Sequence, residues 1–113
     1  MSAITTHVLD TSLGRPAGDL EVTLEVHAGD GYRPIGRGAT DADGRLRTLL
    51  PTGERLVAGS YRITFQTGAY FARQGVAGFY PEVSVTFQVR DPDQHFHVPL
   101  LLSPFGYSTY RGS

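Results

Sequence analysis

The chain has 113 residues, a formal net charge of -1 and no cysteine. This length suits one domain, so a single domain over residues 1–113 is expected. The near-neutral charge offers no basic surface for nucleic acid, and the lack of cysteine excludes disulfides and thiolate metal ligands. No run reaches the roughly 18 apolar residues of a membrane helix, and the first residues lack the pattern of a signal peptide, so a soluble cytoplasmic protein is expected.

Most of the chain alternates apolar and polar residues between Gly- and Pro-rich turns, a pattern typical of an all-β protein. Some seven or eight short strands with closely spaced turns favour a sandwich of two sheets. In chain order, the expected strands cover residues 4–10, 19–28, 32–40, 45–51, 59–68, 82–89, 95–102 and 105–110. The alternation predicts that two of these strands bury one face each, through Leu20, Val22, Leu24 and Val26 and through Tyr61, Ile63 and Phe65.

Two segments carry other signals. Asp41–Gly44, with the sequence DADG, predicts a tight turn, because Asp supplies side-chain hydrogen bonds and Gly tolerates a positive φ. Tyr70–Ala77 has helical spacing, and Gly78 and Pro81 are expected to end this short helix.

Two of the four histidines lie two residues apart in the sequence HFH. On a strand, His95 and His97 would point to the same side and Phe96 to the other. Three interpretations are open: two solvated imidazoles, two neighbouring zinc ligands, or a group for acid–base chemistry. The spacing alone does not separate them.

His7 and two arginines are further candidates. His7 shares a strand face with Leu9, which we take as the apolar side, where a histidine is more often a core residue than a catalyst. Arg45 and Arg47 follow the DADG turn and face the same way, so spacing cannot choose between them. Either guanidinium would suit a carboxylate, an amide or an oxyanion.

The chain ends on YSTYRGS, which brings an α-carboxylate on Ser113. That group is an anion at neutral pH, because its ordinary pKa is about 3.3–3.7. Tyr107 and Tyr110 offer large rings that could hold the tail, and Gly112 allows close approach of the backbone to another group. Arg111 would then neutralise the carboxylate or hold the tail in place.

Three stretches resemble the transthyretin family: HVLDTSLGRPA at residues 7–17, GAYFARQGVAGFYPE at 68–82 and FHVPLLLSPFGYSTYRGS at 96–113. The closing tetrapeptide Tyr110–Ser113, together with His7 and His97, is similar to the 5-hydroxyisourate hydrolase branch of that family. The hormone-carrier branch has a lysine at the position of His7 and a different end.

This resemblance implies an all-β, transthyretin-like sandwich of two four-stranded sheets with one short helix. It implies a homotetramer, a dimer of dimers, with active sites at the dimer–dimer interface. The residues that match the catalytic set of the family are His7, Arg45, His97 and Ser113, with Tyr110, Arg111 and Gly112 expected to bind substrate. His95 is expected to be a neighbour of the site.

The implied substrate is 5-hydroxyisourate, and the implied reaction hydrolyses a cyclic amide bond in its six-membered ring. His7 and His97 would position and deprotonate a water molecule, and Arg45 would stabilise the oxyanion. No cofactor, metal, nucleic acid or membrane is implied. Two rival hypotheses are a non-catalytic carrier of a small aromatic ligand and a zinc hydrolase built on His7, His95 and His97.

Overall fold

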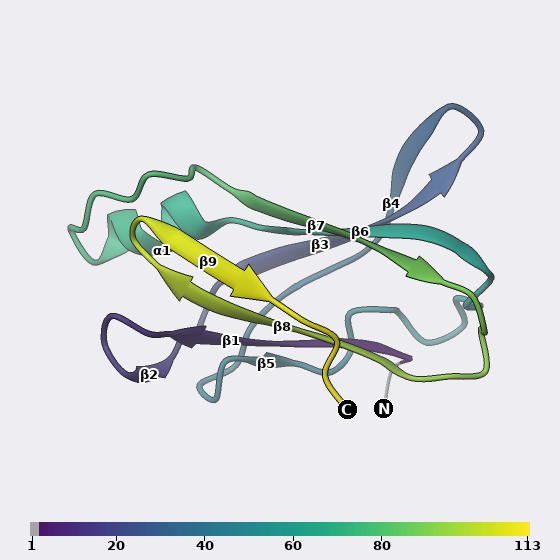
Figure 1. Cartoon of the computed structure of the whole chain (residues 1–113), viewed down its shortest axis with the longest axis horizontal. Coiled ribbons are helices and arrows are strands. Elements are labelled where there is room, and N and C mark those ends of the chain that lie inside the picture. Colours follow the sequence, from purple (N-terminus) through teal and green to yellow (C-terminus); the bar gives the residue numbers. More distant parts are fainter. Residues whose placement is uncertain (1–2) are drawn as a thin grey trace.

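Two β-sheets pack face to face in the computed structural model, which describes residues 3–113 (Figure 1). One sheet has the order β2-β1-β8-β9 with β5 also paired to β1, and the other has the order β4-β3-β6-β7. The elements are β1 Ile4–Asp10, β2 Arg15–Pro16, β3 Glu21–Ala28, β4 Gly31–Ala39, β5 Arg45–Leu46, β6 Gly59–Phe65, α1 Thr67–Arg73, β7 Val83–Val89, β8 Phe96–Ser103 and β9 Gly106–Thr109. The predicted sandwich with one helix is confirmed, with β5 as a short fifth strand of the first sheet.

The core lies between the two sheets and follows the alternation of the strands. Every side chain that the alternation predicted to face inward, on β3, on β6 and at the residue before β3, is buried: Leu20, Val22, Leu24, Val26, Tyr61, Ile63 and Phe65. From the opposite sheet, β1 and β8 contribute Ile4, Val8, Phe96, Val98, Leu100 and Leu102. Burial of this apolar surface is the main force that holds the sheets together.

The prediction that His7 lies on the apolar side of its strand is wrong. Ile4, Thr6, Val8 and Asp10 share the face of β1 that points into the core, and all four are buried. His7 therefore lies on the outer face of the strand. The pattern was ambiguous because the inner face of β1 includes two polar residues. Their polar atoms are satisfied by hydrogen bonds, as when Thr6 Oγ1 donates to the Val98 carbonyl at 2.6 Å.

The helix begins and ends earlier than predicted. It ends at Arg73 because Gly75 adopts a φ of 69°, which reverses the chain. The N–H groups of Gly75 and Val76 donate to the carbonyls of Ala72 and Phe71, both at 3.0 Å, and satisfy the helix end. Within residues 3–113, no helix is long and apolar enough to cross a membrane.

A buried carboxylate ties the end of β1 to the helix. Asp10 is 1% exposed and accepts hydrogen bonds from Tyr70 Oη at 2.7 Å, Ser12 Oγ at 2.6 Å and the backbone N–H groups of Ser12 and Leu13. Burial raises the pKa of Asp10, but these hydrogen bonds together hold that pKa below its ordinary value. Asp10 therefore stabilises the fold above about pH 3.9, and this contribution is lost as the pH falls through the folded-state pKa.

We expect Tyr70→Phe to lower the free energy of unfolding by about 1–3 kcal/mol, because it removes one donor from a buried carboxylate. Urea unfolding at neutral pH measures this change. Tyr32→Phe is the matched control, because the Tyr32 ring lies under Arg62 at 4.3 Å and this contact does not need the hydroxyl. Equal losses in the two variants would contradict a special role of the Asp10–Tyr70 bond.

Candidate active site

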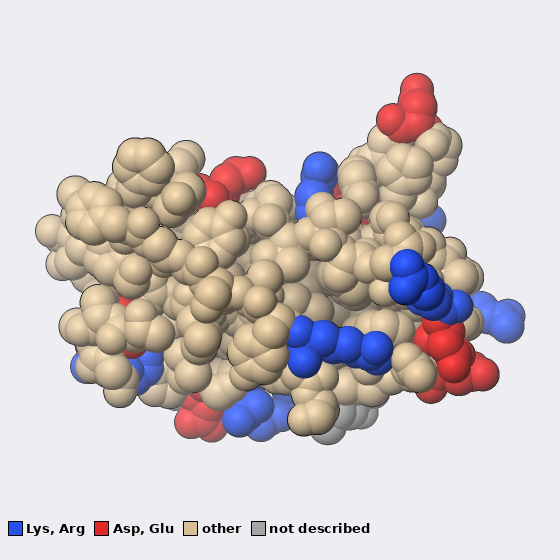
Figure 2. Space-filling model, viewed as in Figure 1, with Lys and Arg blue, Asp and Glu red and all other residues tan. Residues whose placement is uncertain are grey.

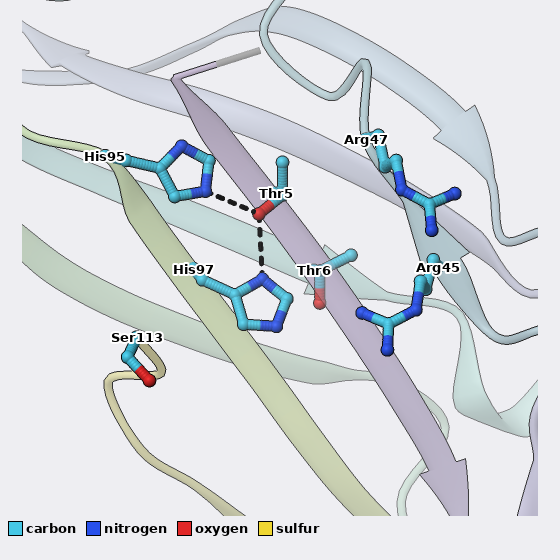
Figure 3. A pocket seen from close by; sticks show the side chains of 7 residues that line it. All are labelled: Thr5, Thr6, Arg45, Arg47, His95, His97 and Ser113. Atoms are coloured by element: carbon cyan, nitrogen blue, oxygen red, sulfur yellow. Dashed lines mark hydrogen bonds between the residues drawn. The ribbon is translucent and has the colours of Figure 1, made fainter. Parts of the chain in front are cut away.

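A polar pocket of about 150 Å³ lies on the outer side of the first sheet (Figure 3). Residues from β1, from β5 and the segment after it, from the start of β8 and from the chain end meet there. The described residues that line it are all polar: Thr5, Thr6, Arg45, Arg47, His95, His97 and Ser113. The pocket therefore brings together five of the residues singled out in the sequence: Arg45, Arg47, His95, His97 and Ser113.

The parallel pairing of β1 with β8 places Thr5 directly beside His97. The hydroxyl of Thr5 lies 2.8 Å from Nδ1 of His97 and 3.1 Å from Nε2 of His95. The HFH pair thus has a shared hydrogen-bond partner, although His95 lies one residue before β8 begins. Thr5 was not singled out in the sequence; the available signal was that it lies two residues before His7, on the same strand face.

The DADG turn forms as predicted and orients two site residues. Asp41 Oδ1 accepts the backbone N–H groups of Asp43 and Arg45 at 2.9 Å, and Gly44 has a φ of 76°. The turn places Arg45 opposite His7 across β1 and β5. It also presents the Asp43 carbonyl to His7 Nε2 at 2.9 Å.

His7 lies beside this pocket rather than among the residues that line it. A carbonyl oxygen can only accept a hydrogen bond, so Nε2 of His7 carries a proton. In neutral His7 the lone pair is therefore on Nδ1.

Both arginines that follow the turn line the pocket, but they differ in surroundings. Arg47 has a side-chain exposure of 53% and pairs with Asp41 at 3.5 Å. Arg45 is half-buried and lies near enough to His97 to act on its protonation. Arg45 is therefore the better placed of the two to contact a group bound at His97.

The chain end runs alongside β8. The Gly112 N–H donates to the His97 carbonyl at 2.8 Å and places Ser113 at the pocket. A Cβ on residue 112 would lie 2.6 Å from Cδ2 of His97, so only glycine fits here without movement of the ring. The predicted close approach at Gly112 is thus present in the structure.

Tyr110 and Arg111, predicted to bind substrate, lie away from this pocket within the single chain. They line a separate cavity of about 230 Å³ between β7 and the start of β8. The Arg111 guanidinium lies 4.6 Å from the centre of the Phe96 ring and donates to Gln94 Oε1 at 3.1 Å. Of the two roles considered for Arg111, these contacts fit the one that holds the tail in place.

The environment of His97 favours its neutral form. Burial lowers the pKa of His97, and the positive charges of Arg45, His7 and His95 lower it further. An uncharged imidazole at neutral pH can accept a proton, which suits a general base.

The described residues 3–113 contain no group of three or more His, Asp or Glu side chains placed to hold one metal ion. The three histidines of the zinc hypothesis do not converge on one point, since His7 donates to the Asp43 carbonyl while the other two meet Thr5.

Comparison with known proteins identifies the family. The model of the HIUase/Transthyretin family matches residues 4–112. This chain belongs to that family. The 5-hydroxyisourate hydrolase of Salmonella dublin is 45% identical over 97% of this chain and 80% of its own length. The protein of the same name from Caulobacter vibrioides is 44% identical over the full length of both chains.

Solved structures from both branches of the transthyretin family share this fold. A 5-hydroxyisourate hydrolase of Klebsiella pneumoniae superposes with a TM-score of 0.85 and 38% identity, over 97% of this chain and 98% of that one. Sea bream transthyretin, solved in complex with thyroxine, superposes with a TM-score of 0.90 and 34% identity, over 98% and 95%. Because both branches superpose well, the fold does not separate hydrolase from carrier.

We expect Gly112→Ala to detach the chain end from β8, because the added methyl group would overlap the His97 ring. The residue-112 amide would then exchange its hydrogen faster, which hydrogen-exchange mass spectrometry or NMR measures. Gly106→Ala is the control, since a Cβ there meets its nearest neighbour, Ser103 Oγ, at an ordinary 3.7 Å. Unchanged exchange at residue 112 would contradict the tight contact.

We expect Arg45→Gln to raise the pKa of His97, because the substitution removes a positive charge that disfavours the imidazolium. An NMR titration of the His97 ring measures this shift. Arg47→Gln is the matched control, since Arg47 lines the same pocket but is paired with Asp41. A shift in the control as large as in Arg45→Gln, or none in either, would show that Arg45 is not the cation that acts on His97.

Proposed function

We propose that this chain hydrolyses 5-hydroxyisourate during urate degradation and opens its six-membered ring to 2-oxo-4-hydroxy-4-carboxy-5-ureidoimidazoline. The proposal is supported by relatives named 5-hydroxyisourate hydrolase that match nearly the whole chain. The observation that carries it is the convergence of Arg45 with His97, whose lowered pKa favours a neutral imidazole, in a pocket whose described lining residues are all polar.

His97 is the proposed general base. Its neutral ring takes a proton from a water molecule, and the water oxygen attacks the carbonyl carbon of the cyclic amide. The carbonyl oxygen becomes an oxyanion, which the Arg45 guanidinium stabilises by roughly 3–4 kcal/mol if it is well aimed. When the oxyanion collapses, the C–N bond breaks and the leaving ring nitrogen takes the proton back from His97.

His7 and Ser113 are proposed to position the reactants. The Asp43 carbonyl holds His7 with its lone pair on Nδ1, so the ring can accept a hydrogen bond from the attacking water. Ser113 lines the pocket, and its carboxylate is proposed to accept N–H groups of the substrate. No step of this scheme requires a metal or another cofactor.

The polar lining also weighs against a carrier function. A carrier of a small aromatic ligand needs apolar walls, and among residues 3–113 only polar residues line this pocket.

We further propose a homotetramer with the active sites at the dimer–dimer interface. The pocket opens on the outer face of the first sheet, where a second pair of subunits could cover it. Figure 2 shows that charged side chains are sparse over the β9 end of the molecule, and Phe79, Phe105, Tyr107 and Tyr110 are exposed large apolar residues. Such exposed apolar groups are typical of subunit contacts. In the proposed tetramer, Tyr110 and Arg111 would reach the polar pocket of a neighbouring subunit.

Ultraviolet monitoring of freshly generated 5-hydroxyisourate tests the proposed activity against the spontaneous decay of the compound. We expect His97→Ala to lower the catalysed rate about 10²–10⁴-fold, the usual contribution of acid–base catalysis. His7→Ala should also lower the rate sharply, because it removes the ring that positions the attacking water. We expect a smaller loss for His95→Ala, because His95 lines the pocket but does not take the proton from water in this scheme, and full activity in the presence of a chelator.

His27→Ala is the control for this series, because His27 is exposed on β3 and packs against Tyr32 at a ring distance of 5.1 Å. Decay no faster with the protein than without it would refute the hydrolase. Loss of activity on chelation that returns with zinc would favour the metalloenzyme.

A further inference from the structure

The Thr5 hydroxyl bridges the two histidines of the pocket and has no role in the mechanism so far. It lies 2.8 Å from Nδ1 of His97 and 3.1 Å from Nε2 of His95 (Figure 3). Thr5 is 4% exposed, so bulk water has little access to compete for its hydroxyl.

Hydrogen-bond accounting allows two arrangements of protons here. A hydroxyl has one proton, so if both contacts are hydrogen bonds, Thr5 donates to one ring and accepts from the other. If Thr5 accepts from His97, then His97 is protonated on Nδ1, and His95, which accepts on Nε2, is also protonated on Nδ1. In the reverse arrangement, both neutral rings are protonated on Nε2.

The charges around His97 select the first arrangement. Nε2 of His97 points to the side of the pocket where the Arg45 guanidinium lies (Figure 3). A guanidinium offers only donors and positive charge, so a lone pair on Nε2 is favoured there over an N–H. The other charged or titratable groups around the ring are Arg47, His7, His95 and the terminal carboxylate of Ser113.

We propose that Thr5 is a positioning residue that holds His97 as its Nδ1–H tautomer and connects this base to His95 as a proton outlet. The leaving nitrogen takes the first proton back from His97, and the carboxylic acid of the opened product then gives a second proton to Nε2 of His97. At that stage Nδ1 can release its own proton to the Thr5 oxygen. Thr5 passes its hydroxyl proton to Nε2 of His95 and ends with one proton, as it began. His97 is then neutral and His95 is an imidazolium, which is exposed and can release a proton to solvent.

The tautomer assignment stands on the geometry alone, whereas its catalytic consequence rests on the proposed function. NMR of ¹⁵N-histidine-labelled protein reads the tautomers directly and needs no substrate. At about pH 8, above the ordinary histidine pKa of about 6.5, we expect His95 and His97 both to be protonated on Nδ1. Two Nε2–H rings in this protein would overturn the assignment.

Variants of Thr5 test the bridge itself. Thr5→Val keeps the shape of the side chain and removes the hydroxyl, so both rings should shift toward the Nε2–H tautomer that predominates in free histidine. Thr5→Ser keeps the hydroxyl and is the matched control, with the tautomers of the original protein. Unchanged tautomers in Thr5→Val would overturn the proposal, and the spectrum of the unsubstituted protein remains a test if that variant fails to fold.

Kinetics then separate the two proposals. We expect Thr5→Val to lower kcat roughly 10- to 100-fold with little change in KM, because part of the base catalysis is lost, and Thr5→Ser to restore it. Expected tautomers without any acceleration of 5-hydroxyisourate decay would refute the hydrolase function but not the bridge. Accelerated decay with equal kcat in Thr5→Val and Thr5→Ser would refute the outlet through Thr5 but not the hydrolase.

Discussion

Parallel pairing of β1 with β8 is the constraint on which the polar pocket depends. These strands are more than 80 residues apart in the chain, and their register sets Thr5 beside His97 and His7 beside Pro99. A shift of one residue would turn every side chain of β1 to the opposite face of the sheet. The register is held by buried residues next to the site residues in the chain, such as Ile4 beside Thr5 and Val8 beside His7. The packing of the core therefore also fixes the geometry of the pocket.

The DADG turn extends this arrangement because it places Arg45 and Arg47, which follow it, beside β1. Asp41 holds the backbone N–H groups of Asp43 and Arg45 and also pairs with Arg47. One carboxylate therefore sets the position of both cations that line the pocket. Burial and the nearby charge of Arg45 both lower the pKa of His97, so its neutral form is favoured.

The chain end takes part in the same construction through its backbone. Gly112 pairs with the backbone of His97, and neighbouring residues of the extended tail point to opposite sides. Ser113 consequently reaches the polar pocket, while Arg111 covers Phe96 on the other side of the sheet edge. The tail thereby connects the polar pocket to the edge of the sheet, where Tyr107 and Tyr110 are exposed.

Much of the fold could be predicted because strand periodicity is a local property. Leu24 and Ile63 lie on the buried faces that alternation indicates, and DADG forms the turn that its residues favour. The helix boundary was misplaced because Gly75, rather than Gly78, takes the positive φ that ends it. The face of His7 was misjudged because Thr6 and Asp10 point inward, and their burial depends on partners far along the chain, the Val98 carbonyl and Tyr70.

For this protein, the sequence alone determined the class of fold, the family signature and the kinds of group available for chemistry. Only the tertiary structure decided which atoms meet: Thr5 between two imidazoles, Arg45 rather than Arg47 acting on His97, and Arg111 outside the pocket. The physical reason is that period two assigns a side chain to a face of its strand. Its neighbours on that face depend on strand register and on the path of the tail, which long-range packing sets.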